Sequence, residues 1–383
     1  MSYSTEQRRH AAAWKHHTEA LPTAAKAPAP YVGKYGRAGG PEYEFCLPAA
    51  LAEHNLLHEV RDDALALFAE LGIPWHAGID GGPGNHLLSS QVQCVNALGQ
   101  MVSDPARVGA AFGSTVPVGE VLEIEPGRYL TFEYIGPTDF FGEALGGDRV
   151  RGTRCTSVDA AFLHRAPDGA RELVLVEWKY TESYRLRDPE PARDETRRRR
   201  YAAAVADPAG PIRDGALPFE LLLDEPFYQL VRQQLLAHAL EQAGVADRVR
   251  VVHVLPPDNL AYQRSLPRPE HRALGESVSE VWGQLLRRPD RYTVMDPAVF
   301  LDDEITNREY VLRYAPDVVW DQAWFAGALG VDTPDQVEDA LDWDGDLELD
   351  ADGVFLRVGT SATGLSFPFR LSDLQELATE LEA

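Results

Sequence analysis

The pattern of apolar and polar positions along the chain predicts a mixed α/β fold. In several segments every third or fourth residue is apolar, which is typical of helices with one buried face. These predicted helices cover residues 48–71, 85–102, 225–242 and 276–288. Shorter runs that alternate or are continuously apolar predict strands, and they cover residues 129–135, 156–164, 172–180 and 249–255.

The order of these elements predicts how the core is connected. Pro167-Asp168-Gly169 separates two predicted strands by a short turn, so these strands are expected to form an antiparallel hairpin. Residues 249–255 follow a long helix and are almost continuously apolar, as expected for a buried, parallel strand. The sequence therefore predicts a core of one helix, three strands, a second helix and a fourth strand, with one crossover.

Changes in composition divide the chain into four predicted parts. The first part is an N-terminal arm with one helix from Glu6 to Ala20, and the second is the α/β core. A helical extension and a small acidic C-terminal module follow, the latter with a strand from Gly353 to Val358 and a helix from Leu371 to Leu381. The predicted boundaries are residues 1–42, 43–265, 266–316 and 317–383.

Charge is segregated along the chain. The total is −24, which argues against a general nucleic-acid coat protein. Residues 316–383 hold 16 acidic residues against 2 arginines, a net −14, whereas residues 185–200 hold seven arginines against four acids. The acidic module is expected to cover a basic groove as a nucleic-acid mimic, to bind a basic or regulatory partner, or only to aid solubility.

The remaining composition indicates a cytoplasmic protein without a membrane segment. No run of 18 or more apolar residues occurs, and the first 17 residues are polar and mixed in charge, unlike a signal peptide. The three cysteines are widely spaced and include no C-x-x-C pair, so neither a disulfide framework nor a zinc knuckle is expected.

Lys179 stands out because the chain has only four lysines against 32 arginines. Arginine stays protonated, whereas lysine is a compact ammonium with an adjustable pKa, so a lone lysine suggests a site that arginine cannot fill. Strand alternation places Glu177 and Lys179 on one face, roughly 7 Å apart. Pairing Leu163 with Leu173 across the turn would set Asp159 opposite Glu177.

Two carboxylates beside one ammonium suit a phosphate-cleaving site. Carboxylate pairs bind Mg²⁺ together with water and phosphate oxygens, and the metal can activate water. A neighbouring lysine can orient that water or stabilise charge on the phosphate. The alternative is that Glu177 and Lys179 form a solvated surface ion pair in a regulatory protein.

Several segments resemble the PD-(D/E)xK nuclease superfamily and, within it, a group of bacterial restriction endonucleases. Asp159 is followed after 17 residues by Glu177-Trp178-Lys179, and longer similar segments cover residues 85–91, 94–96, 151–160 and 175–182. The resemblance implies a restriction-endonuclease-like fold and a nuclease that uses Mg²⁺ or Mn²⁺. By the same resemblance, Asp159 and Glu177 are expected to be metal ligands and Lys179 is expected to be the catalytic lysine.

The sequence departs from the superfamily pattern in two places. Val158 stands where a proline usually precedes the aspartate, and the helix over residues 85–102 holds no acidic residue, although many members use one there. Gln91 or Asn96 could take the equivalent place, or Glu133 on the first strand could supply the additional carboxylate.

Further candidate residues flank this cluster. Gln229 and Gln233 lie one helical turn apart, and in related nucleases a glutamine of this helix lines the active site, so Gln233 is a candidate catalytic residue; surface amides are the alternative. The predicted DNA-binding residues are Arg154, Arg197, Arg198, Arg199 and Arg200.

Together these features predict a metal-dependent DNA endonuclease in defence against foreign DNA. Cutting both strands of a duplex favours a symmetric homodimer. The first alternative is an exonuclease or an RNA nuclease with the same site. The second is a nuclease-like protein that binds DNA or a partner without cutting, which the missing helix carboxylate would favour.

Overall fold

The fold was analysed in a computed structural model of the chain. The structure describes residues 2–33, 39–144, 146–153, 155–186 and 188–316, together with four short strand segments after residue 317. Arg154, the predicted helix Leu371–Leu381 and most of the acidic module lie outside the described residues. Within the described part of the chain, no helix is both long and apolar enough to cross a membrane.

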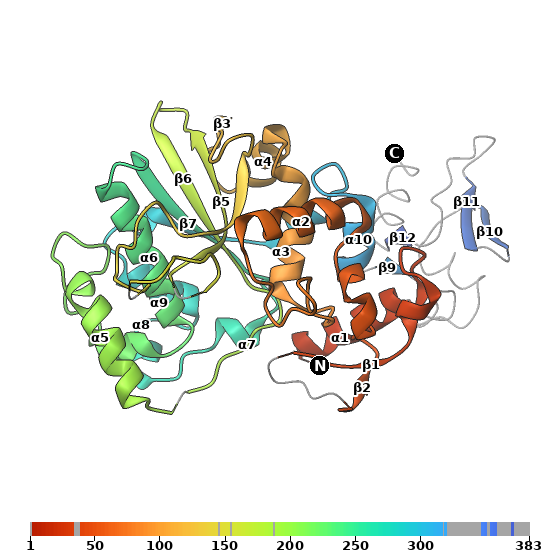
Figure 1. Cartoon of the computed structure of the whole chain (residues 1–383), viewed down its shortest axis with the longest axis horizontal. Coiled ribbons are helices and arrows are strands. Elements are labelled where there is room, and N and C mark those ends of the chain that lie inside the picture. Colours follow the sequence, from red (N-terminus) through yellow and green to blue (C-terminus); the bar gives the residue numbers. More distant parts are fainter. Residues whose placement is uncertain are drawn as a thin grey trace.

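A six-stranded mixed sheet forms the centre of the molecule (Figure 1). Its order is β3-β5-β6-β7-β8, and β4 also pairs with β5. Antiparallel pairing joins β5 to β3, β4 and β6, whereas β6-β7 and β7-β8 are parallel, which confirms the predicted hairpin and crossover. The strands are Glu120–Leu122, Leu130–Tyr134, Val158–Arg165, Arg171–Trp178, Arg248–Val254 and Tyr292–Met295, for β3 to β8 in order.

Helices cover both faces of this sheet (Figure 1). Alternate residues of β6 point to opposite sides: Val174 and Val176 join the core cluster that includes α3, whereas Leu173 and Leu175 pack with α6. Burial on both faces explains why β6 and β7 are apolar along most of their length. The helices α1 to α10 are Tyr3–His17, His58–Leu71, Ser90–Leu98, Pro105–Phe112, Pro191–Val205, Phe227–Gln242, Leu260–Gln263, Pro269–Leu274, Val278–Leu285 and Arg308–Tyr314.

Two predicted helices are shorter in the structure. The segment over residues 48–71 consists of a 3-10 helix, Ala49–Asn55, followed by α2. The helix expected from Asn85 begins only at Ser90, because the Ser89 side chain caps it by accepting from the Val92 N–H. The Asn85 amide instead donates to the carbonyls of Pro30 and Leu47, which holds the preceding segment in an extended course.

The N-terminal segment packs on the core. Helix α1 packs into the core through Trp14, which is fully buried and has the Arg313 guanidinium 4.6 Å from its ring. The buried Lys15 ammonium donates to the carbonyls of Ala27 and Cys46 at 2.8 and 2.7 Å. A short helix can thus bury one large side chain without a long apolar stripe.

The predicted helical extension also contributes to the core, because residues 266–316 supply β8. In the predicted acidic module, the expected strand is present as β11, Gly353–Arg357, which pairs with β10, Asp346–Asp350. The other described strands there, β9 (Val318–Val319) and β12 (Phe369–Arg370), pair with each other. The N-terminal β1 (Ala29–Pro30) and β2 (Glu42–Tyr43) form a further two-stranded sheet.

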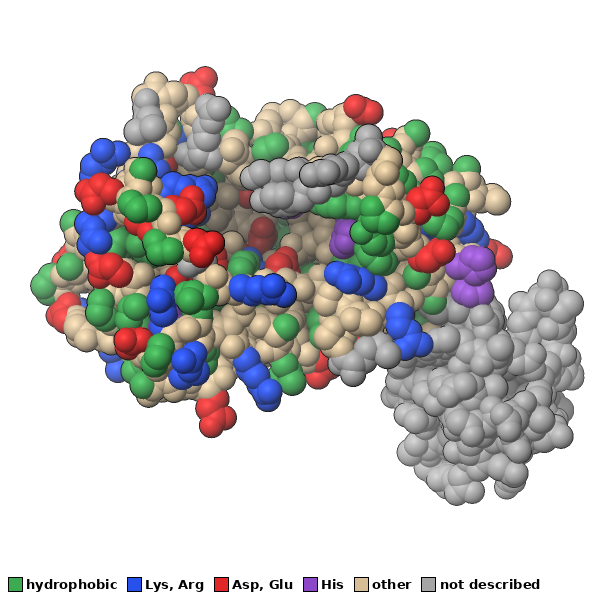
Figure 2. Space-filling model, turned by 90° about the horizontal axis from the view of Figure 1, so that it is seen from below, with side chains coloured by type: hydrophobic (Ala, Val, Ile, Leu, Met, Phe, Trp, Pro, Cys, Tyr) green, Lys and Arg blue, Asp and Glu red, His purple; other side chains and the backbone are tan. Residues whose placement is uncertain are grey.

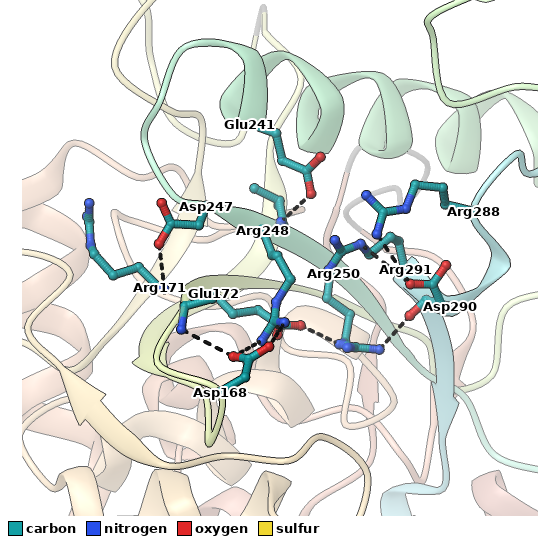
Figure 3. Close-up of polar contacts among 12 residues, drawn as sticks. Asp168, Arg171, Glu172, Glu241, Asp247, Arg248, Arg250, Arg288, Asp290 and Arg291 are labelled. Carbon is teal, nitrogen blue, oxygen red and sulfur yellow. Dashed lines mark hydrogen bonds and ion pairs between the residues drawn. The ribbon is translucent and has the colours of Figure 1, made fainter.

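An ionic network surrounds Glu172 at the start of β6 (Figure 3). The fully buried Glu172 carboxylate pairs with Arg250 at 2.6 Å and with Arg248 at 3.0 Å. The Arg248 guanidinium also donates to the exposed Asp168 carboxylate at 3.0 Å. These contacts tie β6 to β7 and to the hairpin turn, at the start of the strands rather than where Glu177 and Lys179 lie.

Replacing Glu172 by glutamine is expected to lower the free energy of unfolding by about 3 kcal/mol, because it leaves Arg248 and Arg250 without their buried partner. Urea unfolding followed by circular dichroism measures this loss. Asp168→Asn is the matched control, since it removes an exposed partner of the same Arg248 and should cost much less stability, because solvent screens an exposed ion pair. Equal losses in both variants would contradict a special role for the buried carboxylate.

Candidate active site

Three carboxylates lie in one row across β4, β5 and β6. The pairs Phe132–Ala160 and Tyr134–Val158 bracket Glu133 and therefore place it opposite Asp159. The pairs Leu163–Leu173 and Ala160–Val176 of β5 and β6 have the predicted register. The next pair in that register, after Ala160–Val176, is Asp159 opposite Glu177. The row is at the carboxyl end of β6, where the parallel strand β7 places His253 beside Glu177.

These side chains line a cleft of about 1190 Å³. A hollow with acidic side chains inside it is visible on the face shown in Figure 2. Strands β4, β5 and β6 supply the carboxylates, and helices α3, α5 and α6 supply polar side chains around them. The structure therefore brings together the predicted residues Gln91, Glu133, Asp159, Glu177, Lys179, Gln233, Arg197 and Arg200.

Lys179 directly follows β6 and is buried in the cleft, with 6% of its surface exposed. Its ammonium donates to the Glu177 carboxylate at 2.5 Å and to the Gln229 amide oxygen at 2.8 Å. Burial is the largest single influence and favours the neutral amine, but Glu177, Tyr184, Tyr262 and Asp159 together outweigh it and raise the pKa of Lys179 well above its usual value. Lys179 is therefore a protonated hydrogen-bond donor, and its burial excludes a solvated surface ion pair.

Asp159 is held in place by the backbone of the neighbouring strand. The Trp178 N–H donates to one of its carboxylate oxygens at 2.6 Å. Burial and the nearby Glu177 charge raise the pKa of Asp159 well above its usual value, although Lys179 and this hydrogen bond oppose the shift. Ionisation of Asp159 is therefore disfavoured in this site.

Glu133 has an unusual backbone conformation, which among the described non-glycine residues only Ala77 and Asp80 share. It adopts φ 47°, a left-handed conformation that a non-glycine residue takes at a cost of about 1–3 kcal/mol. Its carboxylate accepts from Ser157 at 2.8 Å and from Gln91 at 3.2 Å, and burial raises its pKa. Gly152 also has a positive φ, 69°, and a β-carbon there would lie 3.2 Å from this carboxylate, so a side chain would crowd Glu133.

The donor set fits a hard divalent cation. Glu133 is buried and Asp159 is partly buried; both carboxyl groups have raised pKa values and face a cleft that a small cation can enter. In the described residues no three acidic, histidine or cysteine side chains stand close enough together to form a full ligand set. A cation here would therefore take its carboxylates from the row on β4 to β6 and complete its shell with water and phosphate oxygens, as Mg²⁺ does.

The two glutamines of α6 have different contacts. Gln229 accepts the hydrogen bond from Lys179 and so positions the ammonium. Gln233 lines the cleft and is buried, and within the described structure its side-chain oxygen has no hydrogen-bond partner. Of the other predicted amides, Gln91 contacts Glu133, whereas Asn96 bonds to Leu57, Asn55 and Tyr314 away from the cleft.

The arginine run divides between two faces of α5. Arg197 and Arg200 line the cleft together with Arg193, because residues three or four apart share a helix face. The Arg197 side chain is 15% exposed and lies 4.4 Å from the Tyr228 ring, whereas Arg198 is 46% exposed and pairs with Glu195 and Glu220. Arg198 and Arg199 are thus outside the cleft lining, contrary to a role for all four arginines there.

Sequence reasoning missed several residues of the cleft wall. Arg232 of α6 bonds to Thr156 and to the buried Glu143, and it lies 5.5 Å from the Tyr228 ring. Glu182 and Tyr184, just beyond Lys179, line the same cleft. The spacing of Arg193, Arg197 and Arg200 was a readable signal for one helix face, but Glu143 and Arg232 meet only through the tertiary fold.

Comparison with known proteins assigns the chain to a family. A family model described as "Restriction Endonuclease associating with ARP" matches residues 8–315, which include the whole cleft. No curated protein matches the chain, and no solved structure matches it. The match covers most of the chain, and the mixed α/β fold is compatible with a restriction-endonuclease-like fold. The chain therefore belongs to the family of restriction endonucleases associating with ARP.

Proposed function

We propose that this protein is a metal-dependent DNA endonuclease of the PD-(D/E)xK type that acts in defence against foreign DNA. The observation that carries the proposal is the cluster of Asp159, Glu177 and Lys179 at the base of an arginine-lined cleft. Carboxylates and a protonated lysine are the groups that phosphodiester hydrolysis uses, and family membership supports a nuclease.

Each side chain has a distinct proposed role. Asp159 and Glu177 would hold Mg²⁺ or Mn²⁺, with Glu133 as an additional carboxylate. When bound, the cation would supply Lewis acidity toward the phosphate and water. Lys179 donates a hydrogen bond to the scissile phosphate and stabilises its developing negative charge, a role that suits an ammonium with a raised pKa better than proton abstraction.

The surrounding residues would orient the substrate. Gln229 holds the Lys179 ammonium, and Gln233, one helical turn further along α6, lines the same cleft. Arg193, Arg197 and Arg200 of α5 would contact the phosphate backbone. Cleavage of both strands would use a homodimer, and the acidic segment after residue 316 is proposed as the site of a basic or regulatory partner.

The basic experiment compares supercoiled plasmid, linear duplex DNA and RNA, each with Mg²⁺, Mn²⁺ or EDTA. We expect the plasmid to be nicked or linearised only with a divalent cation. Shortening of linear DNA without plasmid cutting would indicate an exonuclease, and cleavage of RNA alone an RNA nuclease. DNA binding without cleavage under every condition would instead support the catalytically reduced alternative.

The two faces of α5 allow a controlled test of DNA binding. Arg197→Gln combined with Arg200→Gln is expected to weaken binding and to reduce the slope of log K against log salt concentration by about 1.8, since each lost phosphate contact contributes about 0.9. Fluorescence anisotropy with a labelled duplex at several salt concentrations measures both effects. Arg198→Gln combined with Arg199→Gln removes the same charge outside the cleft lining, and an equal change in slope would contradict the assignment.

A further inference from the structure

A second pocket, of about 620 Å³, opens beside the catalytic cleft. The two share His76, Ser90 and Glu182 in their linings, so they adjoin each other. Unlike the cleft, this pocket is walled by aromatic rings, contributed by Tyr31, Tyr43, Phe45 and His86. An aromatic pocket therefore lies within reach of a substrate strand that occupies the cleft.

The rings form a preordered stack. Tyr43 and Phe45 are stacked with their centroids 5.1 Å apart, and the Arg8 guanidinium lies 5.4 Å from the Phe45 centroid. His86 contacts both Phe45 and Tyr31 edge-on, at 5.2 and 5.3 Å. The backbone supports this arrangement, because Tyr43 pairs with Ala29 in the β1-β2 sheet and the Phe45 carbonyl accepts from the Leu87 N–H.

Tyr43 leaves part of this stack open. Its relative exposure is 37%, and it is the one aromatic side chain among the exposed large hydrophobic residues of the described chain, the others being Leu186, Leu260 and Val294. An exposed ring at the end of a stack can be covered by one more planar group. Nucleobases stack on aromatic side chains in this way, whatever their sequence.

The pocket also offers hydrogen-bonding groups for the edge of such a planar group. The Leu88 N–H donates to Nδ1 of His86, and burial lowers the pKa of His86 to about 4, so the neutral ring carries its proton on Nε2 and can donate there. The Glu182 carboxylate, at the junction of the two pockets, can accept. A donor and an acceptor beside a ring surface match the mixed polar edge of a base.

We infer that this pocket binds an unstacked nucleobase of the nucleic-acid strand held in the catalytic cleft. The inference rests on the proposed nuclease function and adds to it a substrate feature, namely a base removed from its stack. Stacking on Tyr43 provides affinity, and His86 and Glu182 read the base edge. The enzyme thus takes its substrate as a single strand or as a duplex with one base extruded.

The test uses the full chain with Lys179→Ala to block cleavage and a single-stranded DNA oligonucleotide that carries one 5-iodouracil. Irradiation followed by mass spectrometry of the peptides is expected to find the cross-link on Tyr43 or Tyr31. Adding Tyr43→Ala should weaken oligonucleotide binding about tenfold, because one base–aromatic stack is lost. Tyr43→Phe should bind as the parent protein does, and Leu260→Ala, which removes an exposed apolar side chain of α7, should have no effect.

The outcomes separate this inference from the proposed function. Cross-links only outside the pocket, or unchanged binding after Tyr43→Ala, would overturn the base pocket while leaving cleavage by the wild-type enzyme intact. If wild type neither binds nor cleaves nucleic acid, the proposed function and the base pocket are both overturned. Circular dichroism of each variant confirms that a loss of binding is not a loss of fold.

Discussion

Replacing Lys179 by alanine is expected to lower the rate of DNA cleavage by about 10²–10³-fold, the usual effect of removing one donor that stabilises a developing negative charge. The physical reason is that Lys179 places a buried ammonium 2.5 Å from Glu177, in the cleft where the phosphate would bind. Single-turnover cleavage of a labelled duplex with Mg²⁺ measures the chemical step. Substrate binding should change much less, because the arginines of α5 remain.

Two controls make this result specific to the lysine. Lys179→Arg keeps the positive charge but replaces a compact ammonium by a larger, planar guanidinium, so its cleavage rate should be little higher than that of Lys179→Ala. Lys26→Ala removes a lysine outside the cleft and should cleave at the wild-type rate. Full activity of Lys179→Arg would show that only positive charge is needed, and full activity of Lys179→Ala would remove the lysine from the mechanism.

The rarity of lysine was a useful but incomplete signal. Lys15 is another of the four lysines, and its side chain is even more buried than that of Lys179. Its ammonium, however, donates to two backbone carbonyls and holds the N-terminal segment on the core. What distinguished Lys179 was its strand face and the register with Asp159. That register was predictable because the short turn at 167–169 leaves few ways to pair the flanking strands, and the structure has the predicted Leu163–Leu173 pair.

Other parts of the site depend on contacts that no local pattern contains. The left-handed backbone of Glu133 interrupts an otherwise regular strand, and nothing in its neighbours' polarity indicates this. The strand β3 has only three residues, and β8 has four. Strand β8 lies within residues 266–316, which were predicted to be a helical extension. Such short elements are stabilised by the sheet they join, so their own sequence carries little information.

Asp159→Asn is expected to have opposite effects on activity and on stability. The amide cannot replace the carboxylate as a metal ligand, so cleavage should fall on the order of 10³-fold, equivalent to several kcal/mol. Its side-chain oxygen can still accept from the Trp178 N–H, so the local structure is kept. Without metal, the variant should unfold at a higher urea concentration, because wild type must ionise Asp159 against desolvation and the nearby Glu177 charge, whereas the amide stays neutral.

The pH dependence of this stability difference follows from the raised pKa of Asp159. When a carboxyl group has a higher pKa folded than unfolded, its contribution to stability is complete below the unfolded pKa, near 3.8, and is lost as pH rises through the folded pKa. The advantage of Asp159→Asn over wild type in EDTA should therefore be small in acid and grow toward neutral and alkaline pH, reaching about 1–2 kcal/mol.

Adding Mg²⁺ should reverse the order of the two proteins. A cation that binds only the folded wild type at 100 times its Kd stabilises it by about 2.7 kcal/mol, whereas Asp159→Asn should gain little. Urea unfolding at pH 8 with EDTA and then with Mg²⁺ gives both differences, and Asp168→Asn, an exposed carboxylate outside the cleft, controls for nonspecific effects of the cation. If Mg²⁺ stabilises wild type and Asp159→Asn equally, Asp159 is not a metal ligand. A less stable variant in EDTA at pH 8 would show instead that the Asp159 charge is well compensated by Lys179 alone.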